Sequence, residues 1–405
     1  MGSTIHLGIG RFEVDWGRNY GFTQLADLFQ PHDVKLALYR YVGEYGAEDG
    51  EPIELQKEAA VRPLERMVGR LELLGFTLES VRRKYAELLA EARLDEPPMS
   101  FDLLAALLCK LDVDAGTADY DWDYDLGEFF AGEIFDRLGL SSHGFNPRDA
   151  RYELGAFMEN LSPLILLRLL AENPKISSRD VTWAFADVMD YGWASREDLI
   201  KSLGVHQRFL VVTEGSSDAK MLKRALELLR PDVADFFYFV DMEAGYPFTG
   251  TGNLHKFTQG LASIAIKNSV VVVYDNDPEG VSKFAETSGL SLPSNIRVMK
   301  LPDHQALSTF STVGPQGDDA ADINGRAAAL ECYLDLSWKA SEPPVVRWTS
   351  YNRQQSAYQG ELLNKQAYMK RFLGLREPVV GYDFSKLDAV LTALLSECVA
   401  IATQS

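Results

Sequence analysis

Four acidic side chains follow two apolar runs in the second half of the chain. Glu214 ends the run RFLVVTE, Gly215 permits a tight turn after it, and Asp218 lies about one helical turn further on. Asp275 and Asp277 follow the run SVVVVY, and their spacing of two directs both carboxylates to the same side if extended backbone continues. Carboxylates without His or Cys suit Mg²⁺ or Mn²⁺ rather than zinc. Two such ions about 4 Å apart activate a water and stabilise the leaving oxygen in phosphoryl transfer, which is the chemistry these residues predict.

Each half of this pattern also has an ordinary structural explanation. Glu-Gly-x-x-Asp at a strand–helix turn is usually turn and capping chemistry, and Asp-x-Asp after a strand is more often a solvated loop. Both halves together, each after a buried strand, favour the metal site. Glu279 is either a further ligand or a cap of the short helix that follows.

The two apolar runs belong to an alternation of strands and helices. Apolar runs predict strands at 208–214, 235–243, 269–274 and 295–301, with helices after the first two. Continuous apolar strands that alternate with helices predict a parallel sheet covered on both faces. Active sites of such sheets form beyond the carboxyl ends of the strands, and the four acids lie there.

The segments VVTEGSSD (211–218) and VVVVYDND (270–277) resemble the Toprim fold of topoisomerases, bacterial primases and OLD-type nucleases. The Toprim pattern is a glutamate after the first strand and Asp-x-Asp after the third. Gly250, Gly252 and Asn253 resemble the turn after the second strand. The resemblance covers about residues 206–305 and implies an α/β Toprim domain there.

The resemblance also implies roles for individual residues. Glu214 would be a catalytic or metal-linked acid, and Asp218 a further catalytic ligand, as in the nuclease branch. Asp275 and Asp277 would be metal ligands. Lys365, in YQGELLNKQAY, is similar in placement to a lysine of OLD-type nucleases, where it would neutralise charge on the pentavalent phosphate. A homodimer is usual for Toprim nucleases and is expected here.

Residues 343–376 reverse the acidic balance of a chain whose formal net charge is −19. Six basic side chains stand against one acid in this segment, with five Trp, Tyr or Phe residues interleaved. Basic groups bind phosphates while aromatic faces stack on bases, so the segment predicts a nucleic-acid groove. The residues expected to bind the phosphates are Arg347, Arg353, Lys370 and Arg371. The alternative is an amphipathic helix with a solvated basic face. Glu331, in LECYL, resembles an acidic helix residue that follows the Toprim core.

The N-terminal part, 1–205, is predicted to be mainly helical after an initial β-hairpin over about 5–16. The whole chain resembles bacterial proteins in which a HEPN-like helical domain is fused to Toprim, a combination associated with antiviral defence against phage. HEPN ribonucleases use an arginine and a histidine a few residues apart. Arg137 and His143 approximate that pattern, but Leu138 replaces the usual polar residue. We therefore expect no ribonuclease activity from this part, and a role in assembly or substrate contact.

The remaining composition excludes several classes of protein. No run reaches the roughly 18 uncharged apolar residues of a membrane span, and the start lacks the pattern of a secretory signal. Three widely spaced cysteines indicate a reducing, cytoplasmic setting and exclude the zinc module of a primase. The layout leaves little room for the gate of a topoisomerase. No Walker A sequence is present, so ATP-driven sensing would come from a partner defence protein.

These observations predict three segments and one leading function. A HEPN-like segment covers 1–205, a Toprim catalytic domain covers 206–305, and a helical, basic and aromatic extension over 306–405 completes the site. The expected function is Mg²⁺-dependent (or Mn²⁺-dependent) endonuclease activity on DNA or RNA. The alternative from another class is a non-catalytic regulator, in which the Toprim domain binds a nucleotide or metal and the helical domain binds a protein.

Overall fold

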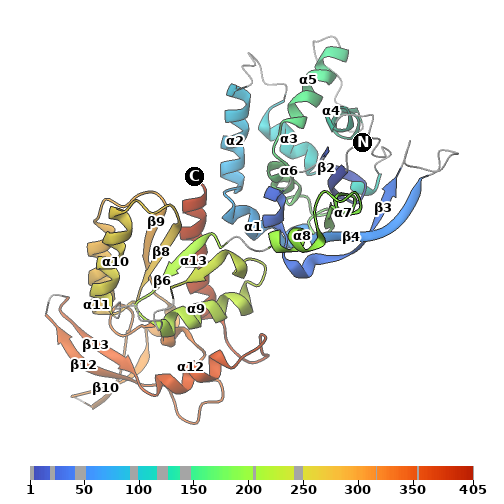
Figure 1. Ribbon diagram of the computed structural model, residues 1–405. Helices are drawn as coiled ribbons and strands as arrows, with labels where there is room; N and C mark the ends of the chain where they lie inside the picture. The colour runs from blue at the N-terminus through green and yellow to red at the C-terminus, as the bar shows by residue number, and fades with distance from the viewer. Residues whose placement is uncertain are drawn as a thin grey trace. The chain divides into compact units, whose positions relative to one another are not determined.

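The computed structural model describes residues 4–18, 23–41, 52–91, 99–115, 126–136, 147–203, 207–240, 250–315, 317–353 and 355–404. The chain divides into two compact units, Met1–His206 and Gln207–Ser405. Figure 1 colours the first unit from blue to green and the second from green to red. Among the described residues, none of the helices has the length and apolar character that a membrane span requires.

The first unit contains a five-stranded antiparallel sheet in the order β2-β1-β5-β4-β3. Its strands are β1 (Thr4–Ile9), β2 (Phe12–Arg18), β3 (Val34–Tyr41), β4 (Ile53–Pro63) and β5 (Asp180–Ala184). The β1–β2 pair is the hairpin that the alternation predicted, and Gly10 takes a positive φ of 61° in its turn. The prediction of a mainly helical domain is wrong, because a sheet runs through it.

Two of the strands that were missed, β3 and β4, carry no clear period of two, and β5 is too short for its alternation to stand out. On the edge strand β3, Leu36 and Leu38 are exposed, while Tyr39 is the one fully buried residue. A strand with apolar side chains on its solvent face does not show the alternation of apolar and polar residues that identifies a half-buried strand. The described helices of this unit are α1 (Val68–Leu73), α2 (Leu78–Glu91), α3 (Phe101–Leu108), α4 (Leu126–Phe130), α5 (Pro147–Glu159), α6 (Pro163–Leu170), α7 (Ala186–Asp190) and α8 (Arg196–Ser202).

The second unit is built on a parallel four-stranded sheet in the order β7-β6-β8-β9. Its strands are β6 (Phe209–Val212), β7 (Phe237–Phe239), β8 (Ser269–Tyr274) and β9 (Ile296–Lys300). Each lies within a run that the sequence predicted. Helices α10 (Thr251–Ser263) and α11 (Pro278–Ser288) pack together on the sheet, as do α9 (Ser216–Leu229) and α13 (Ser385–Ala402) (Figure 1). The apolar strands are buried because helices cover the sheet.

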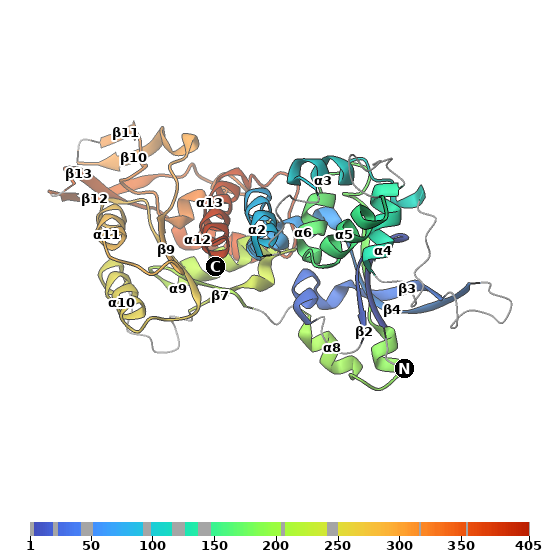
Figure 2. The same ribbon diagram turned by 90° about the horizontal axis from the view of Figure 1, so that it is seen from above.

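The C-terminal segment was predicted to be helical, but it contains a second sheet in the order β11-β10-β12-β13. Its strands are β10 (Phe310–Gly314), β11 (Gly317–Ala321), β12 (Val346–Asn352) and β13 (Ala357–Leu362), and α12 (Lys365–Leu373) follows. A β-bulge between Trp348 and Ser350 breaks the register of the β12–β13 hairpin, which hides the period of two in the sequence. Figure 2 shows this sheet beside α11, at one end of the unit.

Candidate active site

The carboxyl ends of β6 and β8 bring two distant parts of the chain together. The strands pair in parallel, with Val212 opposite Val272, so Glu214 and Asp275 emerge at the same edge of the sheet. Glu214 Oε1 accepts a hydrogen bond from the backbone N–H of Asp275 at 3.1 Å. The glutamate after the first strand therefore contacts the aspartate pair after the third.

Asp277 is held by two further segments. Its Oδ1 caps α11 by accepting from the Gly280 N–H at 2.7 Å, and its Oδ2 accepts from Gln359 Nε2 of β13 at 3.1 Å. Gly280 is required here, because a Cβ at this position would clash with the carbonyl oxygen of Asp275. The first turn of α11 thus packs directly on the backbone of the aspartate pair.

Asp218 lies in the first turn of α9, and charged residues of the C-terminal segment shift its pKa. Burial and then the charge of Glu331 raise its pKa to about 7, against hydrogen bonds from Ser217 and Gly215 and the charge of Lys365. Lys365 Nζ forms an ion pair with the buried Glu331 carboxylate at 3.3 Å. The pKa of Lys365 is raised, chiefly by Glu331, so the lysine stays protonated. The structure therefore brings Lys365 into the surroundings of Asp218.

Glu214, Asp218, Asp275 and Asp277 form a carboxylate cluster. Burial and the charges of neighbouring acids raise the pKa of all four. The pKa of Glu214 rises to about 8, first through burial and then through the charges of Asp277, Asp218 and Glu279, against the hydrogen bond from Asp275. The pKa of Asp275 lies well above its ordinary value, first because of burial and then because of the charges of Asp218, Glu214, Glu331 and Asp277. The pKa of Asp277 is raised by burial and by Glu279, against its hydrogen bonds. A cation at this edge would relieve the repulsion.

The donor chemistry fits a hard divalent cation, although the site is not closed around one. Within the part of the chain that the structure describes, no three His, Cys, Asp or Glu side chains are grouped as a ready-made metal site. The oxygen donors Glu214, Asp218, Asp275 and Asp277 suit Mg²⁺ or Mn²⁺, with side-chain rearrangement on binding. Glu279 accepts a hydrogen bond from the Thr251 hydroxyl, and its charge raises the pKa of Glu214 and Asp277, so it lies near the same acids.

Comparison with known families identifies the N-terminal part of the chain. A family model described as HEPN/Toprim N-terminal domain 1 matches residues 1–207, more than half of the 405 residues. The chain belongs to the HEPN/Toprim N-terminal domain 1 family. No curated protein and no solved structure matches it. The match supports the HEPN/Toprim fusion that the sequence resembles.

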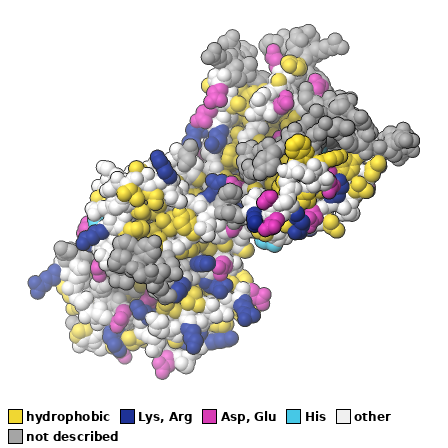
Figure 3. All heavy atoms as spheres, in the orientation of Figure 1, with side chains coloured by type: hydrophobic (Ala, Val, Ile, Leu, Met, Phe, Trp, Pro, Cys, Tyr) yellow, Lys and Arg dark blue, Asp and Glu magenta, His cyan; other side chains and the backbone are white. Residues whose placement is uncertain are grey.

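The other site residues of this HEPN/Toprim protein are placed less closely around the acids. Arg347 and Lys370 are exposed on β12 and α12, and Arg353 is exposed just after β12. Arg371 donates to the Trp338 carbonyl oxygen at 3.0 Å and lies over the ring of Tyr368, so its guanidinium is held within the fold. Figure 3 shows Lys and Arg side chains in dark blue on the α9 and α12 side of the second unit. Arg137 and His143 lie outside the described residues.

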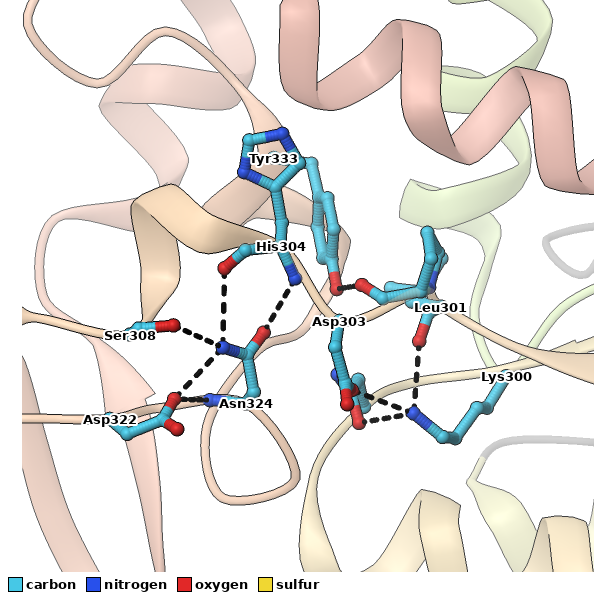
Figure 4. Close-up of polar contacts among 10 residues, drawn as sticks. Lys300, Leu301, Asp303, His304, Ser308, Asp322, Asn324 and Tyr333 are labelled. Atoms are coloured by element: carbon cyan, nitrogen blue, oxygen red, sulfur yellow. Dashed lines mark hydrogen bonds and ion pairs between the residues drawn. The ribbon is translucent and has the colours of Figure 1, made fainter.

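A polar network behind the aspartate pair was not anticipated from the sequence. Asn276 is fully buried, donates to Asp303 Oδ1 at 2.8 Å and accepts from Lys300 Nζ at 3.0 Å. Its backbone N–H donates to the Ala328 carbonyl at 3.1 Å. Lys300 also pairs with Asp303 at 2.9 Å, as Figure 4 shows. Because Asn276 separates Asp275 from Asp277, the network fixes the backbone that carries both carboxylates.

The network continues along the chain after β9. Tyr333 donates to the Pro302 carbonyl at 2.6 Å, and Asn324 accepts from the His304 N–H at 2.9 Å (Figure 4). Asn324 in turn donates to Asp322 Oδ1 at 2.8 Å. These contacts attach the segment after β9 to residues 322–333 and leave the aspartate pair on a rigid support. Only the Asp-x-Asp spacing marks Asn276 in the sequence, and nothing marks Lys300 or Gln359.

Replacing Asn276 by Ala is expected to lower the free energy of unfolding by about 2 kcal/mol, because the fully buried Asn276 amide loses its hydrogen bonds with Asp303 and Lys300 and a cavity remains. The midpoint of urea denaturation measures the change. Asn268→Ala, which removes an exposed amide before β8, is the control and should cost far less. Equal losses of unfolding free energy in the two variants would show that the hydrogen bonds of Asn276 contribute no more to stability than those of an exposed amide.

Lowering the pH of the metal-free protein from about 8 to about 6 is expected to raise its Tm by a few degrees. Glu214 and Asp218 have folded-state pKa values of about 8 and about 7, above their unfolded values. The folded state therefore binds protons that the unfolded chain does not, and this stabilisation is lost as the pH rises through those values. Differential scanning fluorimetry in EDTA measures it.

Asp15 in the first unit shifts the Tm in the same direction, because burial raises its pKa to about 7. The double variant Glu214→Gln, Asp218→Asn therefore isolates the share of these two residues, and it should make the pH dependence of Tm smaller. Mg²⁺ should also flatten it, since the cation replaces the protons as the source of neutralisation. A Tm that decreases as the pH is lowered from about 8 to about 6 would contradict these pKa assignments.

Proposed function

We propose that this protein is a Mg²⁺-dependent (or Mn²⁺-dependent) endonuclease of the OLD-like Toprim type, which hydrolyses nucleic-acid phosphodiesters as an effector of defence against phage. One observation carries the proposal: Glu214 Oε1 lies 3.1 Å from the backbone nitrogen of Asp275, so acids from two parallel strands share one sheet edge. That arrangement of acids is the one that the Toprim resemblance implies.

The acids of the cluster and Lys365 have different roles in the proposed reaction. Glu214, Asp218, Asp275 and Asp277 would hold the divalent ion, which when bound polarises the phosphate and lowers the pKa of water. Asp277 accepts hydrogen bonds from Gly280 and Gln359, so the fold sets the orientation of its carboxylate. Lys365, held by Glu331 at 3.3 Å, supplies a fixed positive charge for the phosphate oxygens. The first unit, in this proposal, serves assembly as a homodimer or contact with the substrate or a partner defence protein.

The test is cleavage of a panel of nucleic acids by the purified full chain. Supercoiled plasmid, single-stranded DNA and tRNA are incubated with Mg²⁺, Mn²⁺ or EDTA, and products are resolved on gels. The proposal expects cleavage of at least one substrate with either ion and none in EDTA. Cleavage that persists in EDTA, or in Asp275→Asn, would assign the activity to a contaminant or to another site.

A non-catalytic regulator is the second candidate. Glu214, the acid that a nuclease would use, accepts a hydrogen bond from the Asp275 backbone, which a structural role would also explain. A regulator would bind Mg²⁺ with a rise in Tm but would cleave no substrate in the panel. Asp275→Asn would then remove the Tm rise and leave partner binding by the first unit intact.

A further inference from the structure

The β12–β13 hairpin carries three aromatic side chains on one face. Tyr351 pairs with Tyr358 across the hairpin, and Trp348 pairs with Gly360, two residues beyond Tyr358 on the same strand. The Tyr351 and Tyr358 rings lie 5.1 Å apart edge to face, and Trp348 and Tyr358 lie 6.2 Å apart. Tyr351 is 52% exposed and Tyr358 49% exposed. Soluble surfaces do not usually gather adjacent exposed rings without a ligand for them.

Two glycines make room for the Trp348 indole to lie flat on the sheet. A Cβ at Gly314 of β10 would lie 2.9 Å from Trp348 Cδ1, and a Cβ at Gly360 of β13 would lie 3.0 Å from its Cε3. Both distances are shorter than a normal carbon–carbon contact, so any larger residue would lift the ring. The indole therefore rests on the backbone of both neighbouring strands. With Tyr351 and Tyr358 it forms a rigid aromatic platform, named here for these three residues.

Two exposed arginines lie on or next to the hairpin that carries the aromatic platform, and Glu361 stands opposite one of them, Arg347. Arg347 on β12 and Arg353 just after it are exposed, in a chain whose net charge is −19. Gln359, next to Tyr358 on β13, donates to Asp277 at 3.1 Å. The strand β13 is at the edge of its sheet, so a chain that stacks on Tyr358 has a short path around that edge to the carboxylates.

We propose that the aromatic platform binds unpaired bases, so that the substrate class of the site is single-stranded nucleic acid, or a single-stranded stretch within a duplex. A base inside a duplex offers its faces only to its neighbours in the stack, whereas an unpaired base is free to stack on a protein ring. The exposed Arg353, two residues after Tyr351, is available to the phosphates that join the bases. The link to cleavage rests on the proposed nuclease function, but the binding does not.

The experiment measures binding without cleavage. The full chain in EDTA is titrated, at constant salt, into fluorescein-labelled oligonucleotides of about 20 nucleotides, and anisotropy gives Kd. The probes are single-stranded DNA, single-stranded RNA of the same sequence, and the blunt DNA duplex. Binding to the single strands should be tighter than to the duplex, and the two single-stranded arms distinguish DNA from RNA. The double variant Tyr351→Ala, Tyr358→Ala should weaken single-strand binding about tenfold or more.

Two further variants keep the result specific. The double variant Tyr351→Phe, Tyr358→Phe retains the rings and should bind as the native chain does. Tyr191→Ala removes a tyrosine that is 62% exposed in the first unit, and it should not change binding. Circular dichroism and Tm confirm that each variant folds.

The proposal is overturned if the duplex binds as tightly as the single strands, if the double Ala variant binds unchanged, or if no oligonucleotide binds. The last outcome would leave a protein partner as the occupant of the rings. Cleavage with Mg²⁺ is scored separately. A protein that cleaves without using the aromatic platform refutes this inference alone, and one that binds single strands but never cleaves refutes the nuclease alone.

Discussion

Replacing Asp275 by Asn is expected to reduce nucleic-acid cleavage about a thousandfold or more, which corresponds to about 4 kcal/mol of transition-state stabilisation. Asp275 stands among the acids of the cluster, and Glu214, Asp218, Glu331 and Asp277 all raise its pKa. Asn keeps the shape of the side chain but removes the charge that a divalent cation requires. Initial rates with Mg²⁺ on the substrate that the panel identifies measure the loss.

Stability separates a lost metal ligand from a damaged fold. Removal of one charge from a repelling cluster should raise the Tm of the metal-free protein, and it should abolish the rise in Tm that Mg²⁺ gives the native chain. Asp318→Asn, on the exposed strand β11, is the matched control and should change neither the rate nor the response to Mg²⁺. An Asp275→Asn protein that folds and cleaves at the native rate would remove this residue from the site.

The parallel sheet of the second unit could be predicted because its strands are continuous apolar runs. The predicted strand at 269–274 coincides with β8 (Ser269–Tyr274), whose valines are buried from both faces. An acid directly after such a run must lie at the carboxyl edge, so the positions of Glu214 and Asp275 followed from the chain direction alone. Local sequence was sufficient, since a parallel pair of neighbouring strands aligns its ends.

The contributions of the C-terminal segment could not be predicted in the same way. Gln359 reaches Asp277 only because a bulged hairpin turns back on the first sheet, and Lys365 meets Glu331 across 34 residues of chain. No periodicity encodes which distant segment an edge will meet, because that depends on packing between elements. In the first unit, β3 could not be predicted because Leu36 and Leu38 are exposed. Apolar side chains on the solvent face remove the alternation of apolar and polar residues that identifies a strand.

Replacing Lys365 by Met is expected to reduce kcat about a hundredfold while KM changes little, because a fixed charge next to the phosphate acts on the transition state more than on binding. Lys365 begins α12, its Nζ lies 3.3 Å from the Glu331 carboxylate, and its side chain is 45% exposed, so it can reach a bound substrate. Lys365→Arg keeps the positive charge and should recover part of kcat. Steady-state rates on the cleaved substrate give both constants.

The pH profile tests whether Lys365 acts through its charge. Lys365 lowers the pKa of Asp218, which burial and Glu331 raise to about 7. Loss of the lysine removes that opposing charge, so the pKa of Asp218 rises further and the acidic limb of the rate profile moves to higher pH. Lys223→Met, on the exposed face of α9, is the control and should leave the profile in place. A Lys365→Met enzyme with lower kcat but an unshifted acidic limb would show that the lysine does not act on Asp218, and its role would then be confined to the phosphate.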